Sequence, residues 1–191
     1  DFWEIDIHIG GKAHDLLDKS VQEDLLARIS AGEFDAVILS PPCGSWSRTN
    51  WANGDGPPPC RDKDSPWGFA HNSAGQRRRA EDGNEFVHFT IRAIIAAQEA
   101  RQRGAKTRCL LEHPEDLGRV SPSALHQGVP ASIWQLDELR AAFGTNPATT
   151  VAGWQCQFPG VEYAKPTRLD SDHPGVETFG RKGWRVLVPD E

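Results

Sequence analysis

Methionine is absent from the 191 residues of this chain, and the sequence also lacks a CxxC pair and any long apolar run. The four cysteines stand far apart, at positions 43, 60, 109 and 156, so we expect neither a disulfide framework nor a zinc site. No apolar stretch approaches the roughly 18 residues that cross a membrane. We therefore expect a metal-free protein without a membrane span, in a reducing intracellular compartment, the cytoplasm or the nucleus.

Positive charge is also in short supply, because the formal net charge is −6. This balance argues against a general nucleic-acid coat protein. The cations are nevertheless unevenly spread, and a local basic segment on an acidic domain can still contact phosphates. A solvated loop is the alternative interpretation of that segment. Its cationic residues are Arg61, Lys63, Arg77, Arg78 and Arg79.

The length favours one domain with its own core, spanning residues 1–191. Apolar and polar side chains alternate over residues 2–9, and this pattern predicts that the chain begins within a strand. We therefore expect this chain to be a truncated segment of a longer protein, although a processed amino terminus would give the same start.

Strands and helices are predicted to alternate along the chain. Parallel strands need crossover connections, so this alternation predicts a single α/β domain with a mostly parallel sheet flanked by helices. The expected strands are 2–9, 35–40, 107–112, 149–158 and 183–188, and the expected helices are 18–31, 84–103 and 132–143.

Residues 48–83 are predicted to form a long loop, because glycine and proline are frequent there and aliphatic side chains are few. A loop of this length inside a compact domain is usually functional or disordered. Its aromatic residues, Trp51, Trp67 and Phe69, argue against pure disorder, since aromatic surface is costly to leave in water.

A thiol follows the predicted strand 35–40, because Pro41 and Pro42 end that strand and Cys43 comes next. Open α/β sheets bind ligands at the carboxyl ends of their strands. A free cysteine is more often a small buried hydrophobic residue, which is the alternative for Cys43.

The predicted strand 107–112 ends in the same manner, at Glu112-His113-Pro114. In a parallel sheet both carboxyl ends face one rim, so we expect Cys43 and Glu112 to converge on one ligand. A thiolate can add to an electron-poor ring, and a carboxylic acid can protonate that ring to make it more electrophilic. Taken alone, a glutamate at a strand end is more often a surface carboxylate, which is the alternative for Glu112.

These segments resemble the cytosine-5 DNA methyltransferase family, which carries Pro-Cys after one strand and Glu-Asn-Val/Pro after the next. The matching segments here are Pro42-Cys43-Gly44-Ser45-Trp46-Ser47 and Glu112-His113-Pro114. The family's Gln and Asn are replaced by Gly44 and His113. Further on, residues 160–169 resemble the family's Gly-(x)-Pro-Gln-x-Arg-x-Arg segment, in which Arg168 matches the last arginine.

The resemblance implies a Rossmann-like methyltransferase fold and a covalent mechanism. Cys43 would attack carbon 6 of a cytosine, Glu112 would contact ring nitrogen 3, and Arg168 would hold the ring oxygen. The base would be flipped out of duplex DNA or lie in a single strand. The loop would close over it. The implied DNA contacts are Ser47, Arg48, Arg77, Arg78, Arg79 and Lys165.

The resemblance also implies S-adenosylmethionine as methyl donor, bound by Glu4, Asp6, Asp15 and Pro41. The three acids could instead be turn or cap residues. The family's glycine-rich donor loop and its target-recognition region have no counterpart in this sequence, so we expect residues outside the chain to complete the donor site.

Two other functions remain open at this stage. A degenerate, non-catalytic relative would bind nucleic acid or a protein partner. A cysteine hydrolase would need a histidine base beside Cys43, and the candidates are His71, His88 and His113.

Overall fold

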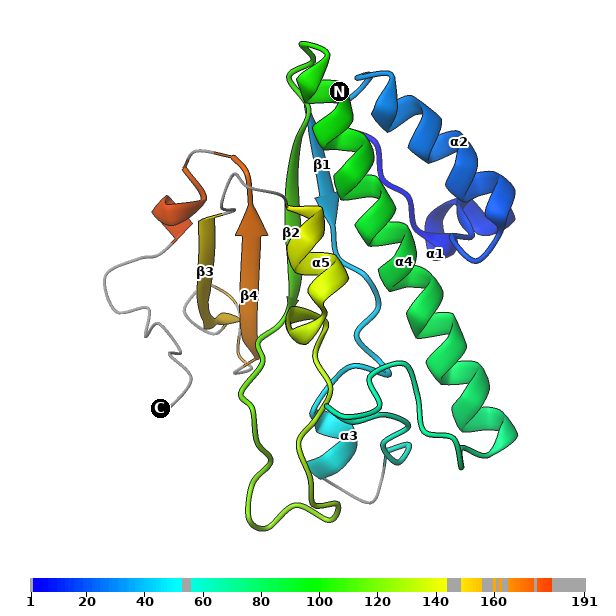
Figure 1. Ribbon diagram of the computed structural model, residues 1–191, viewed down its shortest axis with the longest axis vertical. Coiled ribbons are helices and arrows are strands. Elements are labelled where there is room, and N and C mark those ends of the chain that lie inside the picture. The colour runs from blue at the N-terminus through cyan, green and yellow to red at the C-terminus, as the bar shows by residue number, and fades with distance from the viewer. Residues whose placement is uncertain are drawn as a thin grey trace.

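The protein folds around one open four-stranded sheet with its helices packed beside it (Figure 1). The computed structural model describes residues 2–52, 56–143, 149–155, 160, 162, 165–173 and 175–179. The strands lie in the order β1-β2-β4-β3. They are β1 Ala36–Leu39, β2 Arg108–Pro114, β3 Thr149–Trp154 and β4 Pro166–Ser171.

The expectation of a mostly parallel sheet is wrong, although the mixed α/β class is confirmed. Among the described strands, only β1 and β2 pair in parallel, with Leu39 opposite Leu111. β1, β2 and β3 do run in one direction. β4 inserts between β2 and β3 in the opposite direction, and this makes both of its ladders antiparallel. No strand was predicted over residues 166–171, since residues 160–169 were matched to the family's arginine-bearing segment.

The amino-terminal segment is not the strand that its alternation predicted. Residues 2–6 are extended without a strand partner among the described residues, and the short helices α1 (Ile7–Gly10) and η1 (Gly11–His14) follow. The side chain of Asp6 accepts a hydrogen bond from the His8 amide, which caps α1 and stops an extended continuation.

Two helices cover the region next to β1 and β2. α2 (Lys19–Ser30) begins after Asp18, whose side chain accepts a hydrogen bond from the Ser20 amide, so Asp18 is the N-cap. α4 (Ala74–Gln102) begins ten residues before the expected start at 84. A capping box between Ser73 and Gln76 starts it early, before its apolar face begins.

The core lies between α4 and one face of the sheet. Leu39 of β1 and Leu111 of β2 are buried against the helix residues Ala93 and Ile94. Because side chains alternate across a strand, Ile38 points to the opposite face, where its side chain is 63% exposed. The sheet is therefore packed more completely on the α4 side than on the side of Ile38.

Two further predictions were partly correct. The helix expected at 132–143 is divided into η2 (Ile133–Gln135) and α5 (Asp137–Ala142), because Leu136 between them is extended. The strand expected at 149–158 is confirmed over 149–154. The strand expected at 183–188 lies outside the described residues. The other elements are α3 (Thr49–Ala52) and η4 (Val176–Phe179).

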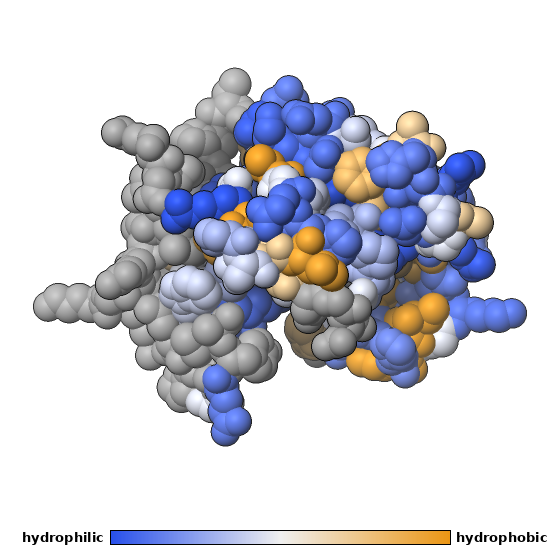
Figure 2. All heavy atoms as spheres, turned by 90° about the horizontal axis from the view of Figure 1, so that it is seen from below, coloured by the Kyte–Doolittle hydropathy of each residue, from blue (hydrophilic) through white to orange (hydrophobic). Residues whose placement is uncertain are grey.

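On the face seen from below, the described residues are largely polar, and hydrophobic residues form small separate patches among hydrophilic ones (Figure 2). None of the described helices is long and apolar enough to cross a bilayer.

Candidate functional site

The carboxyl ends of β1 and β2 lie side by side, as the site prediction requires. Both strands point toward the end of the molecule that holds α3 and the loop after β2 (Figure 1). The Ser40 hydroxyl donates a hydrogen bond of 2.7 Å to Oε2 of Glu112. This bond joins the residue after β1 to the end of β2, so the Glu112 carboxylate is fixed beside the strand that leads to the thiol.

Lys165 binds the other oxygen of the same carboxylate. Its Nζ lies 3.3 Å from Oε1 of Glu112, and the two side chains are 34% and 20% exposed. Lys165 precedes β4, so three separate segments meet at one carboxylate. The set of Ser40, Glu112 and Lys165 is called the Glu112 cluster below.

Cys43 lies three residues beyond Ser40 on the same segment. Pro41 is buried and Cys43 is half-buried. The Cys43 carbonyl accepts a hydrogen bond of 3.0 Å from the Trp46 amide, which closes a tight turn around Gly44 and Ser45. Cys43 therefore lies outside regular structure, three residues along the chain from Ser40 of the Glu112 cluster.

Arg168 is not brought to Glu112. Its guanidinium makes two hydrogen bonds to the fully buried carboxylate of Glu115, at 3.0 and 2.6 Å, and its Cζ lies 5.3 Å from the ring centre of Trp134. In the β2–β4 ladder Arg168 is the partner of His113, the strand neighbour of Glu112. Successive side chains of a strand point to opposite faces, so Arg168 shares a face with His113 and lies on the face opposite Glu112.

His113 is buried on the face of Arg168. Burial, and to a smaller extent the positive charge of Lys165, lower its pKa to about 3. Neither ring nitrogen has a hydrogen-bond partner among the described residues. The imidazole is therefore neutral at physiological pH, and it is a packed side chain of the core and not a base for a cysteine hydrolase.

The predicted loop at 48–83 is ordered around a buried arginine. The guanidinium of Arg61 donates to the carbonyls of Pro66 and Ala80, to the side chain of Asn84 and to the Ser45 hydroxyl, over 2.7 to 3.1 Å. Its Cζ lies 3.8 Å from the ring centre of Trp46, and burial lowers its pKa. Arg61 therefore connects this loop to α4 and to the turn after Cys43. Its guanidinium is not available to bind phosphate.

α4 approaches that same turn at a glycine. A Cβ on Gly83 would lie 2.1 Å from the Ser45 hydroxyl, and the Gly83 carbonyl accepts a hydrogen bond of 3.2 Å from the Trp46 indole. The position of the turn after Cys43 therefore depends on the absence of a side chain in the middle of α4.

Some of the residues expected to contact DNA make hydrogen bonds within the protein, and others are exposed. Ser47 accepts a hydrogen bond from the Thr49 amide at the start of α3, and Arg79 donates to the carbonyl of Pro58. Arg77 and Arg78 are exposed on the first turns of α4 and not on a loop. Arg48 is half-buried and lines a small cavity.

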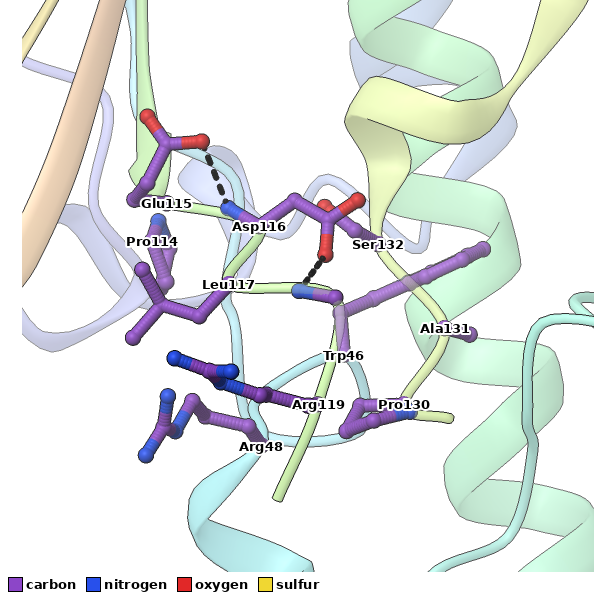
Figure 3. A pocket seen from close by; sticks show the side chains of 11 residues that line it. Trp46, Arg48, Pro114, Glu115, Asp116, Leu117, Arg119, Pro130, Ala131 and Ser132 are labelled. Carbon is purple, nitrogen blue, oxygen red and sulfur yellow. Dashed lines mark hydrogen bonds between the residues drawn. The ribbon is translucent and has the colours of Figure 1, made fainter. Parts of the chain in front are cut away.

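That cavity holds about 10 Å³, which is room for one water molecule and not for a base. Figure 3 shows its wall, with the side chains of Arg48 and Arg119 near the loop after β2. The Glu115 carboxylate in this wall also accepts from the Asp116 amide at 2.9 Å. The cavity adjoins Glu115 and not the Glu112 cluster.

The residues implied for S-adenosylmethionine do not form a site for it among the described residues. The carboxylates of Asp6 and Asp15 accept backbone hydrogen bonds in local turns, and Glu4 is exposed. A hollow of about 310 Å³ opens between the amino-terminal segment and α2. It is lined by Trp3, Ile5, Ala13, His14, Ser20, Val21, Asp24, Leu25 and Arg28, and by none of the implied residues.

Sequence reasoning missed Ser40 altogether and assigned Lys165 to DNA phosphates. The only sequence signal for Ser40 was a hydroxyl at the end of the strand before Pro41.

Within the described ranges no three metal-ligating side chains are placed to hold an ion. Comparison of the chain with protein-family models, with curated proteins and with solved structures finds no match.

Proposed function

We propose that this chain is the core of a cytosine-5 DNA methyltransferase, in which Cys43 adds to carbon 6 of a cytosine. The observation that carries the proposal is the hydrogen bond between Ser40 and Glu112. It holds an acid near the carboxyl end of β2, beside the segment that carries the Cys43 thiol. The sequence resemblance at these two strand ends supplies the identity of the reaction.

The addition follows from the chemistry of the two groups. The Cys43 thiol loses its proton to solvent, and the thiolate forms the bond between its sulfur and carbon 6. The electron pair of the C5–C6 double bond moves into the ring toward nitrogen 3, which takes a proton from the Glu112 carboxyl. The resulting enamine is nucleophilic at carbon 5, where it forms a new bond to an electrophile. Carbon 5 then loses its proton to solvent, the thiolate departs with the electron pair of the carbon–sulfur bond, and nitrogen 3 returns its proton to the Glu112 carboxylate, which restores the aromatic ring and the enzyme.

S-adenosylmethionine would supply the methyl group to carbon 5. The described residues build no site for it, so the chemistry derived for this chain ends at the covalent adduct. A base inside a duplex cannot reach Cys43, so the substrate is a flipped base or a single strand. The exposed Arg77 and Arg78 are the described cations best placed for its phosphates.

Covalent trapping that needs no methyl donor tests the proposal. The protein is mixed with a single-stranded oligonucleotide carrying 2-pyrimidinone in place of cytosine, whose carbon 6 is more electrophilic. Mass spectrometry of the intact protein and of its peptides should show one adduct on Cys43. Cys43→Ala should abolish it, and Glu112→Gln should slow it by about a hundredfold or more, the usual contribution of a general acid.

The outcomes separate this proposal from the non-catalytic alternative. That alternative is favoured by the engagement of Arg168 with Glu115 and by the capping roles of Asp6 and Asp15. A degenerate domain would bind the oligonucleotide without forming the adduct. An adduct that persists in Cys43→Ala would also reject the mechanism.

A further inference from the structure

A lysine supplies positive charge directly to the proposed acid. Nζ of Lys165 lies 3.3 Å from Oε1 of Glu112, while Ser40 holds Oε2 at 2.7 Å. The Lys165 side chain is one third exposed and its stem is flexible, so the ammonium can exchange its partner when a ligand enters. Its three donors can serve an acceptor on that ligand.

The arginine that the sequence suggested is held elsewhere. Both hydrogen bonds of Arg168 go to a carboxylate with no exposure to solvent, on the opposite face of the sheet. Turning Arg168 toward Glu112 would leave the Glu115 charge buried without its partner. Lys165 can therefore exchange its carboxylate partner for a ligand, whereas Arg168 cannot.

We infer that Lys165 is the residue that contacts the ring oxygen of the pyrimidine, and that Arg168 is a structural residue. This inference rests on the proposed function. When the base enters, Lys165 leaves Oε1 of Glu112 and donates to the oxygen on carbon 2. Addition of the thiolate moves negative charge from carbon 5 toward nitrogen 3 and that oxygen, and a cation there stabilises the charge as it develops.

A change of one substrate atom tests the contact directly. Two oligonucleotides are compared, one with 2-pyrimidinone and one with pyrimidine-2-thione, in which a poorly accepting sulfur replaces the oxygen. The rate of adduct formation on Cys43 is measured for both. For the unaltered protein we expect the oxygen probe to react at least about tenfold faster, the loss typical of one charge-assisted hydrogen bond.

The same ratio in variants identifies the residue responsible. In Lys165→Met the ratio should fall to near one, through slower reaction of the oxygen probe, and Lys165→Arg should restore it. Arg168→Lys is the matched control and should keep the full ratio. Because the ratio is taken within one protein sample, partial unfolding of a variant does not change it.

Two results would overturn the inference in different ways. If the Cys43 adduct forms but the ratio survives in Lys165→Met, or collapses in Arg168→Lys, then Lys165 is not the contact and the proposed function stands. If the unaltered protein forms no Cys43 adduct with either probe, the proposed function fails and the inference fails with it.

Discussion

The guanidinium of Arg168 is held by the buried carboxylate of Glu115 through two hydrogen bonds, on the face of the sheet opposite Glu112. This pair fixes β4 against the chain that leaves β2. It also removes the arginine with the best sequence match from the proposed site and leaves Lys165 as the cation at Glu112.

The pair should be strongly coupled in stability. Arg168→Met should lower the free energy of unfolding by about 3–5 kcal/mol, because it leaves the Glu115 carboxylate buried and unpaired. Adding Glu115→Gln should recover much of this loss, since the buried charge is then gone. Urea denaturation of the two single variants and the double variant measures the coupling. Losses that simply add would show that the two residues do not act as a pair.

Two glycines of α4 should respond in opposite directions to the same substitution. Gly83→Ala should cost about 1–3 kcal/mol, since its Cβ would meet the Ser45 hydroxyl that Arg61 holds. Gly75→Ala meets no atom within 4 Å and should stabilise the protein by up to about 1 kcal/mol. Thermal unfolding of both variants gives the comparison. Equal effects would mean that α4 does not approach the turn after Cys43 so closely.

His113 should make stability fall in mild acid. Its pKa is about 3 in the folded protein against 6.5 for an unperturbed histidine, so the unfolded chain binds the proton first as pH falls. This contribution is absent above about pH 7. Between about pH 6.5 and 3 it lowers the free energy of unfolding by about 1.4 kcal/mol per pH unit.

Urea denaturation at several pH values measures that slope. His113→Asn should unfold with a shallower loss of stability below pH 6.5 than the unaltered protein. The exposed His71 is the matched control, and His71→Asn should leave the slope unchanged. Parallel pH profiles for the unaltered protein and His113→Asn would contradict the burial of a neutral imidazole.

The described cysteines should differ in reactivity toward iodoacetamide. Cys43 is half-buried, whereas Cys60 and Cys109 are buried, and burial raises the pKa of the Cys109 thiol to about 12. In the native protein the Cys43 peptide should be labelled first. The peptides of Cys60 and Cys109 should be labelled only after unfolding, and prior adduct formation with the 2-pyrimidinone oligonucleotide should block labelling at Cys43. Early labelling of Cys109 would place that thiol outside the core.

Local patterns predicted the elements that surround the thiol. The apolar run before Pro41 correctly gave β1, the run before His113 gave β2, and helical spacing gave α2 and most of α4. These assignments hold because each depends on neighbours in the sequence. The loop assignment at 48–83 was wrong in part, because α3 and the start of α4 lie within it. The contacts that order the rest around Arg61 reach partners up to 23 residues away, which local patterns do not show.

The direction and facing of β4 could not be read from the sequence. Residues 166–171 begin with a proline and contain one arginine and one aspartate, and only their pairing with β2 and β3 makes them a strand. The mostly parallel sheet was predicted because the antiparallel insertion of β4 leaves no local signal. The hydrogen bond between Ser40 and Glu112 could not be predicted either, because the two residues are 72 positions apart in the sequence.

The sequence by itself determined that a thiol follows one strand and that an acid lies near the carboxyl end of another, since apolar runs and prolines mark where those strands lie. Tertiary structure alone decided which cation joins them. Side chains alternate across a strand, so the register of β4 against β2 places Arg168 on the face of Glu115. A shift of one residue in that register would reverse the choice.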